Sequence, residues 1–172
     1  MKTIKRGMGS HESAAMITDE WLTPPEIVKA LGSFDLDPCS PINRPWDTAK
    51  IHYTRPTGLF EPGGLERPWH GRVWLNPPYG KHTGEWLKKL SEHGNGIAII
   101  FARTETRMFF KYVWYKADAV FFIEGRLKFY KADGTLSDTG GNAGAPSVLI
   151  AYGKQNAEIL KNSKIKGKFL YL

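Results

Sequence analysis

The run of seven residues from Gly96 to Ala102 contains no polar side chain, and a segment with a helical pattern lies on either side of it. A short, continuous apolar run is typical of a strand that is covered on both faces of a parallel sheet. Two further apolar runs, Val73–Leu75 and Ala119–Ile123, lie before and after it, each separated from it by one helical pattern. This order predicts an α/β fold with a mostly parallel sheet.

The remaining patterns complete a predicted order of elements. We expect a helix from Thr23–Glu26 to Gly32, strands at Phe34–Asp37, near Ala49–Tyr53 and at Val73–Leu75, a helix at Thr83–His93, a strand at Gly96–Ala102, a helix near Thr106–Lys116, a strand at Ala119–Ile123 extended by Arg126–Tyr130, a strand at Ser147–Tyr152, and a short helix and a strand within Lys154–Leu172.

Two local features refine this prediction. Thr23 is a good N-cap, Pro24 suits the first helical position, and Glu26 would complete a capping box. The Gly- and Asp-rich segment Lys131–Ala145 joins the last two strong strands without a helix. A connection without a helix favours antiparallel pairing, so we expect an antiparallel strand at one edge of the sheet.

The length of 172 residues suits one domain. Residues 1–20 are polar and show no periodicity, so we expect a flexible N-terminal arm followed by a single domain over residues 21–172.

Lys and Arg number 24 against 17 Asp and Glu, which gives a net charge of +7. Such a charge suits a polyanionic partner such as nucleic acid, and it also serves solubility alone. Cys39 is the only cysteine, so we expect neither a disulfide framework nor a metal site built on clustered cysteines, and the histidines lack ligand spacing. No apolar run suits a membrane span or a secretory signal, so we expect a cytoplasmic protein without a membrane partner.

Ligands bind beyond the carboxyl ends of the strands in an open α/β sheet. Two of the predicted strand ends carry unusual polar sequence, Asp37-Pro38-Cys39-Ser40 and Asn76-Pro77-Pro78-Tyr79. The two prolines of the second segment remove two amide donors and leave a rigid, extended turn whose carbonyls can accept hydrogen bonds. The Asn76 side-chain oxygen and the Pro77 carbonyl could each accept one N–H of an exocyclic amine while Tyr79 stacks on the attached ring. The alternative is a turn that merely ends a strand.

Asn76-Pro77-Pro78-Tyr79 resembles the catalytic motif of amino-methyltransferases that use S-adenosylmethionine. Thr23-Pro24-Pro25-Glu26 resembles their cofactor-side motif, and the segment Phe34–Cys39 resembles their first cofactor strand with its acidic end. Over residues 20–152 the chain resembles the small, phage-encoded, Dam-like DNA N6-adenine methyltransferases.

The resemblance implies a Rossmann-like, S-adenosylmethionine-dependent methyltransferase fold in abbreviated form, without a separate target-recognition domain. The implied catalytic residues are Asn76, Pro77, Pro78 and Tyr79, and the implied cofactor-binding residues are Trp21, Thr23, Pro24, Asp37, Pro38, Cys39, Ser40 and Asn43. No Gly-x-Gly turn follows Asp37, so Ser40 or Asn43 is expected to meet the methionine carboxylate. Glu61 and Glu66 are the candidates for holding the cofactor ribose.

The implied reaction is methyl transfer from S-adenosylmethionine to N6 of an adenine that is flipped out of double-stranded DNA. No metal is needed, and a monomer is expected. The expected DNA contacts are Arg103, Arg107, Arg126 and Lys128, which would otherwise be an ordinary solvated face, and residues 52–72 and 131–146 are the loops long enough to contact DNA. The resemblance also suggests a phage or prophage protein of a bacterial host with a role in restriction–modification.

Three alternatives stay open at this stage. The same tetrapeptide occurs in enzymes that methylate a protein glutamine amide, although those usually add a glycine-rich cofactor turn and a helical domain. An RNA amino-methyltransferase would share the whole chemistry. A catalytically silent DNA-binding protein could have kept the fold.

Overall fold

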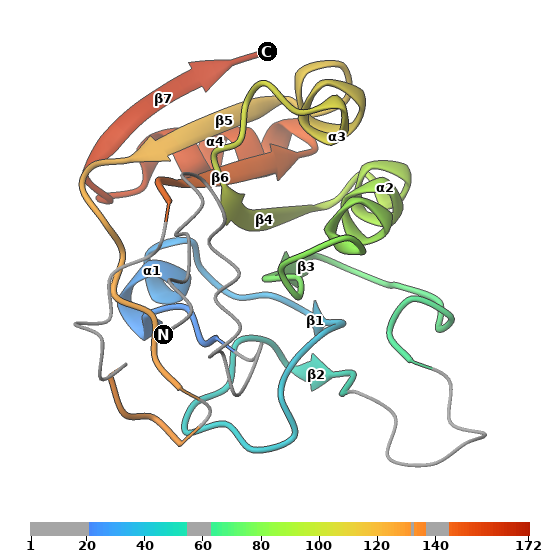
Figure 1. Ribbon diagram of the computed structural model, residues 1–172, viewed down its shortest axis with the longest axis vertical. Coiled ribbons are helices and arrows are strands. Elements are labelled where there is room, and N and C mark those ends of the chain that lie inside the picture. Colours follow the sequence, from blue (N-terminus) through green and yellow to red (C-terminus); the bar gives the residue numbers. More distant parts are fainter. Residues whose placement is uncertain (1–20, 55–62, 132, 137–144) are drawn as a thin grey trace, which may run out of the picture.

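The computed structural model describes residues 21–54, 63–131, 133–136 and 145–172, so the arm expected at residues 1–20 lies outside the described residues. Strands and helices alternate along most of the chain (Figure 1). The elements are α1 Pro25–Ala30, β1 Leu36–Asp37, β2 Ile51–His52, β3 Val73–Leu75, α2 Thr83–His93, β4 Gly96–Phe101, α3 Arg107–Phe109 with the π-helical turn Phe110–Trp114, β5 Ala119–Ile123, β6 Ser147–Tyr152, α4 Lys154–Asn162 and β7 Gly167–Tyr171.

The described strands form one sheet in the order β2-β1-β3-β4-β6-β5-β7. The pairings among β2, β1, β3 and β4 are parallel, whereas β6 is antiparallel to both β4 and β5, and β7 is antiparallel to β5. The expected α/β class is therefore confirmed, and β7 is an antiparallel edge strand.

The expected place of the segment Ser147–Tyr152 was wrong. This strand, β6, is antiparallel as predicted, but it lies between β4 and β5 and not at an edge. Every residue of β6 is buried, whereas most residues of β7 are exposed. The fully buried, mostly apolar strand therefore takes the interior position and the lysine-containing strand takes the edge.

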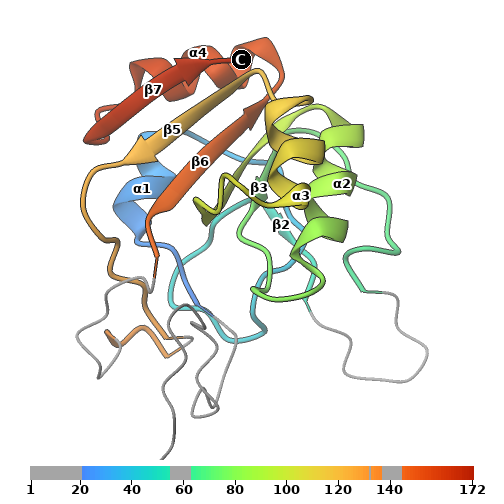
Figure 2. The same cartoon turned by 45° about the horizontal axis from the view of Figure 1, so that its top comes forward.

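Helices cover both faces of the sheet, as Figure 2 shows. Alternate residues of β4 point to opposite faces, so Ile97 and Ile99 join one buried cluster while Ala98 and Ile100 join the other. The first cluster includes apolar residues of α1 and α4, and the second includes those of α2 and of the helical segment 107–114. Three layers result, with the sheet in the middle.

Three local predictions needed correction. Helix α1 begins at Pro25 with Pro24 as its N-cap and no side-chain cap, so the capping box at Thr23 was wrong. A residue that precedes a proline is driven to extended backbone, and Pro24, followed by Pro25, has ψ 131°. The helix near Thr106–Lys116 was predicted correctly in place, but its second half is a π-helical turn.

The segment Arg126–Tyr130 does not extend β5. The chain turns at Gly125, where φ is +78°, and Tyr130 instead makes main-chain hydrogen bonds with Leu22. This exchange connects the segment before α1 to the segment after β5.

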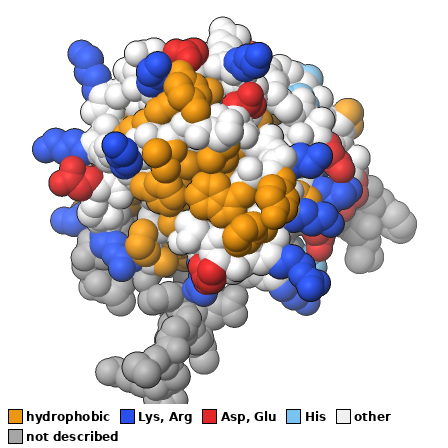
Figure 3. Space-filling view, turned by 90° about the horizontal axis from the view of Figure 1, so that it is seen from above, with side chains coloured by type: hydrophobic (Ala, Val, Ile, Leu, Met, Phe, Trp, Pro, Cys, Tyr) orange, Lys and Arg blue, Asp and Glu red, His pale blue; other side chains and the backbone are white. Residues whose placement is uncertain are grey.

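The β7 end of the molecule carries large exposed apolar side chains. Figure 3, which views this end, shows apolar side chains gathered together with Lys and Arg around them. The exposed apolar residues of β7, the chain end and the π-helical turn include Phe110, Tyr115, Leu170, Tyr171 and Leu172.

Candidate active site

The two polar segments singled out in the sequence meet at one edge of the sheet. Because β1 and β3 are parallel neighbours, Asp37–Ser40 and Asn76–Tyr79 leave the sheet on the same side. The Cys39 thiol lies 3.1 Å from the main-chain oxygen of Asn76, to which it donates a hydrogen bond. The expected juxtaposition of these two segments is therefore present.

Asn76 is held from two directions. Its side-chain Nδ2 donates to the main-chain oxygen of Trp21 at 2.5 Å, and its own main-chain oxygen accepts from Cys39. The remaining polar atom of its side chain, Oδ1, is buried and has no hydrogen-bond partner. A buried acceptor without a partner is costly, so its presence needs an explanation.

The main-chain oxygens of the motif also differ in whether they accept a hydrogen bond. The Pro78 oxygen accepts from the Thr83 hydroxyl at 2.9 Å, which ties the motif to the start of α2. Among the described residues, none donates a hydrogen bond to the Pro77 oxygen. Asn76 Oδ1 and the Pro77 oxygen are thus two neighbouring acceptors of this turn to which no described residue donates.

Tyr79 lies next to these acceptors in the chain, and its ring stacks on Phe101 at the carboxyl end of β4. The Tyr79 hydroxyl is buried without a partner, and burial raises the pKa of this phenol well above its usual range. The hydroxyl therefore stays protonated, and the flat ring is the part of this residue that could contact a base.

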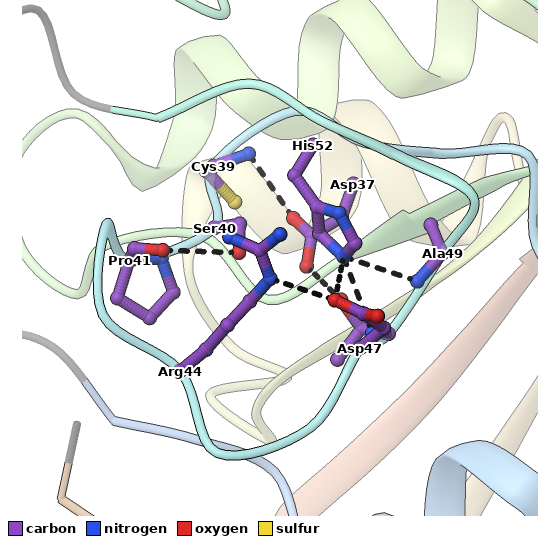
Figure 4. Close-up of polar contacts among 9 residues, drawn as sticks. Asp37, Cys39, Ser40, Pro41, Arg44, Asp47, Ala49 and His52 are labelled. Atoms are coloured by element: carbon purple, nitrogen blue, oxygen red, sulfur yellow. Dashed lines mark hydrogen bonds and ion pairs between the residues drawn. The ribbon is translucent and has the colours of Figure 1, made fainter. Parts of the chain in front are cut away.

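Asp37 ends β1 and is 4% exposed. Figure 4 shows its carboxylate among the residues of the following loop. The carboxylate accepts from the Cys39 main-chain nitrogen at 3.1 Å and from the Thr48 hydroxyl. Burial raises the pKa of Asp37 to about 6, although these hydrogen bonds and the nearby Arg44 act in the opposite direction. Asp37 is therefore a structural anchor of the loop as well as a candidate cofactor ligand.

The other residues of the expected cofactor set lie around the same edge, but in different environments. Thr23 is 2% exposed and its hydroxyl has no partner, while Pro24 and Pro38 are buried and Trp21 is half-buried. The Ser40 hydroxyl donates to the Pro41 oxygen at 3.3 Å. Asn43 is exposed.

The four expected DNA contacts are all exposed and all follow carboxyl ends of strands. Arg103 and Arg107 follow β4, whereas Arg126 and Lys128 follow β5. Within the described part of the chain, no carboxylate forms an ion pair with any of them. Their charges are therefore available to a polyanion on the side of the sheet that carries the motif.

The structure assigns neither candidate for holding the cofactor ribose to this site. Glu61 lies outside the described residues, and Glu66 is an exposed loop residue. No group of His, Cys, Asp and Glu among the described residues could hold a metal ion. None of the helices in the described part of the chain has the length and hydrophobicity needed to cross a membrane.

Sequence reasoning missed three residues that shape this edge. Thr48 donates a hydrogen bond to Asp37, Gly64 packs on the loop after β1, and Phe101 stacks on Tyr79. A Cβ at Gly64 would lie 1.8 Å from the Pro38 oxygen, so only glycine fits. For Phe101, its position at the end of an apolar strand was a signal in the sequence that it lies near the site.

A comparison with protein families identifies the chain. A family model described as DNA N-6-adenine-methyltransferase (Dam) matches residues 10–168. The chain belongs to this family. The match confirms the Dam-like resemblance seen over residues 20–152, and it includes every residue of the site described above. Searches among curated proteins and among solved structures gave no match.

Membership in the Dam family supports DNA adenine methylation as the general activity of the chain.

Proposed function

We propose that this Dam-family protein transfers a methyl group from S-adenosylmethionine to N6 of an adenine flipped out of double-stranded DNA. The observation that carries the proposal is the pair of free acceptors, Asn76 Oδ1 and the Pro77 oxygen, beside the ring of Tyr79. In this proposal residues 21–172 are one methyltransferase domain with a Rossmann-like sheet.

The chemistry asks for two acceptors because the adenine amine is a weak nucleophile. Its lone pair is delocalised into the ring, and its two N–H groups lie in the ring plane. Acceptors at Asn76 Oδ1 and the Pro77 oxygen would hold both hydrogens and direct the nitrogen lone pair away from the ring. Acceptors fixed in advance by the fold need no reorganisation during the reaction.

Tyr79 supplies the surface for the base. The base would stack on the face of Tyr79 that Phe101 does not cover, which offsets part of the cost of removing it from the duplex. The buried, protonated hydroxyl plays no acid–base role in this scheme.

The residues around Asp37 fit S-adenosylmethionine, which supplies an electrophilic methyl group on a sulfonium sulfur when bound. The unpartnered, buried hydroxyl of Thr23 is a polar group that a ligand at this edge would satisfy. We propose that Trp21, Thr23, Pro24, Asp37, Pro38, Cys39, Ser40 and Asn43 surround the cofactor. Asp37 would act mainly by fixing the loop, since Cys39 and Thr48 already donate to its carboxylate.

Arg103, Arg107, Arg126 and Lys128 would hold the DNA backbone while the base enters the site. As the resemblance implies, we place this activity in the cytoplasm of a bacterial host, in a protein of phage or prophage origin with a role in restriction–modification. The protein would act as a monomer, without a metal.

The test is methyl transfer from labelled S-adenosylmethionine to duplex DNA, RNA and a protein extract in parallel. Label on N6 of adenine in duplex DNA, and its loss in Asn76→Ala, would support the proposal. Label on RNA or on glutamine alone would support one of the other amino-methyltransferases. Cofactor binding without transfer to any of the three would contradict an enzymatic function.

A further inference from the structure

We propose that Cys39 is a positioning residue for methyl transfer, which acts through the hydrogen bond from its thiol to the main-chain oxygen of Asn76. This inference rests on the proposed function: Cys39 lies among the residues proposed to surround the cofactor, but its thiol donates to the Asn76 oxygen, so the task assigned to the thiol is not cofactor binding. It concerns how the free acceptors of the motif are kept in place.

The motif Asn76-Pro77-Pro78-Tyr79 has few donors of its own with which to fix its conformation. Pro77 and Pro78 have no amide hydrogen, so the turn lacks two of the donors that would normally fix a loop to its neighbours. Its geometry must therefore be set by donors from elsewhere. These donors are the Cys39 thiol on the Asn76 oxygen and the Thr83 hydroxyl on the Pro78 oxygen, and they bracket the free Pro77 oxygen on both sides.

Cys39 is well suited to this task because its own position is fixed. Its main-chain nitrogen donates to the buried Asp37 carboxylate at 3.1 Å, which anchors it to the end of β1. Burial raises the pKa of the thiol well above its ordinary value, so the sulfur keeps its hydrogen and remains a donor. The thiol thus connects the end of β1 to the end of β3 by one hydrogen bond, with 3.1 Å between sulfur and oxygen.

The Asn76 oxygen belongs to the planar peptide group between Asn76 and Pro77, so the thiol fixes the orientation of that plane. The other tie of Asn76, from Nδ2 to the Trp21 oxygen, fixes its side chain. These two bonds hold Asn76 and its Oδ1, and the bond from Thr83 to the Pro78 oxygen holds the other side, so the Pro77 oxygen lies between two fixed peptide groups. A small misplacement of reacting groups lowers a rate strongly, so the loss of one tie should affect the chemical step.

The first experiment compares Cys39→Ala and Cys39→Ser with wild type in single-turnover methyl transfer at saturating cofactor. We expect Cys39→Ala to lower the rate about threefold to tenfold, the range for one hydrogen bond, while the cofactor Kd stays within about twofold. Serine can donate to the same oxygen, so Cys39→Ser should recover most of the rate. Ser163→Ala, which removes a hydroxyl donor to the Leu160 oxygen at the end of α4, is the matched control and should behave as wild type.

Cys39→Val fills the space of the thiol with apolar atoms, at the cost of one additional methyl group, and replaces Cys39→Ala if alanine prevents folding. A wild-type rate in the alanine or valine variant would overturn the inference, as would a serine variant as slow as alanine. A loss of rate that follows a weaker cofactor Kd would assign Cys39 to cofactor contact instead. A wild-type protein that methylates no DNA would overturn the proposed function itself, and this inference with it.

A second measurement does not depend on activity. Cys39 is the only cysteine of the chain, so the S–H stretching band in the infrared spectrum reports on this thiol alone. We expect the band of the folded protein at lower frequency than that of the urea-unfolded protein, as for a donating thiol. A band at the unfolded position would show that the bond is absent and overturn the inference.

Discussion

The ring of Tyr79 lies almost parallel to the ring of Phe101, with 4.2 Å between their centroids and 19° between their planes. Phe101 is the last residue of β4, and Tyr79 is the last residue of the motif that follows the neighbouring strand β3. The sheet itself therefore supports the orientation of the Tyr79 ring.

Replacing Tyr79 with phenylalanine should have little effect on methylation, because the variant keeps the ring and its stacking on Phe101. The folded protein should be as stable as wild type or more stable, since the variant removes a buried hydroxyl without a partner. Tyr79→Ala should instead weaken DNA binding by about 1–3 kcal/mol of lost stacking. DNA titrations and thermal unfolding check both variants, and equal loss of activity in the two would contradict the stacking role.

Phe101→Leu should retain the fold but release the Tyr79 ring from its support. An aromatic pair contributes about 0.5–1.5 kcal/mol beyond the area that it buries. We expect weaker binding of DNA and an unchanged cofactor Kd, measured by titration of each ligand. Phe122→Leu on β5 is the control, because Phe122 is also half-buried near the sheet end but does not stack on Tyr79.

Asn76→Ala should lower the single-turnover rate by about 10²–10³, the usual effect of removing a preorganised hydrogen-bond partner at a reacting centre. Cofactor affinity should stay near that of wild type. Asn76→Asp keeps the acceptor but places an oxygen against the Trp21 carbonyl, so its rate should fall less and should recover as the pH is lowered, because a protonated carboxyl can donate there. An Asn76→Ala rate equal to wild type would contradict the catalytic assignment.

DNA binding should weaken steeply as salt is added, because basic residues without ion-pair partners face the side of the sheet that carries the motif. Arg126→Glu should weaken binding and reduce the salt dependence of the Kd. Lys154→Glu makes the same charge change on an exposed residue where α4 begins, at the opposite end of the strands from the motif, and should have a smaller effect. A Kd that does not vary with salt would exclude this mode of binding.

Asp37 should make the stability of the protein depend on pH in a distinctive direction. Its pKa rises from an ordinary 3.8 to about 6, so the folded state binds this proton more tightly than the unfolded state. The contribution of Asp37 is therefore most favourable near pH 4 and below, declines as the pH rises to about 6, and amounts to roughly 3 kcal/mol.

The comparison that isolates this effect is wild type against Asp37→Asn in urea unfolding at several pH values. Asparagine can accept from Cys39 as aspartate does, while the Thr48 hydroxyl can turn to accept from the new amide. The difference in unfolding free energy between the two proteins should shift in favour of the variant between about pH 4 and pH 6. A constant difference across this range would mean that the pKa of Asp37 is not raised.

The order of elements could be predicted because each carries its own local signal. Helix α2 has both its predicted ends, since Gly94 takes a φ of +72° that stops the helix. The location of the motif after β3 was likewise visible as two prolines and an asparagine behind a buried strand. These features depend on neighbours in the sequence.

The missed features depend on contacts between distant segments. The hydrogen bond from Thr48 to Asp37 spans 11 residues, and that from Cys39 to Asn76 spans 37. No pattern in a single sequence marks such pairs. The interior position of β6 was, in hindsight, indicated by its continuous apolar run Val148-Leu149-Ile150-Ala151, whereas β7 contains Lys168.

The position of β6 between β4 and β5 also determines when these two strands can join one sheet during synthesis. Residues 96–101 and 119–123 are made first, but β4 and β5 have no ladder between them and share only the later strand 147–152. A nascent chain that has not yet reached residue 147 therefore carries one unpaired edge on β4 and two on β5, and such apolar strand edges are prone to association with other chains. The same late segment places Pro146 beside β4, where its oxygen accepts from the Ala102 nitrogen at 2.8 Å. The strand that joins β4 to β5 is thus made only after both of them, and β7, which pairs with the other edge of β5, is made later still.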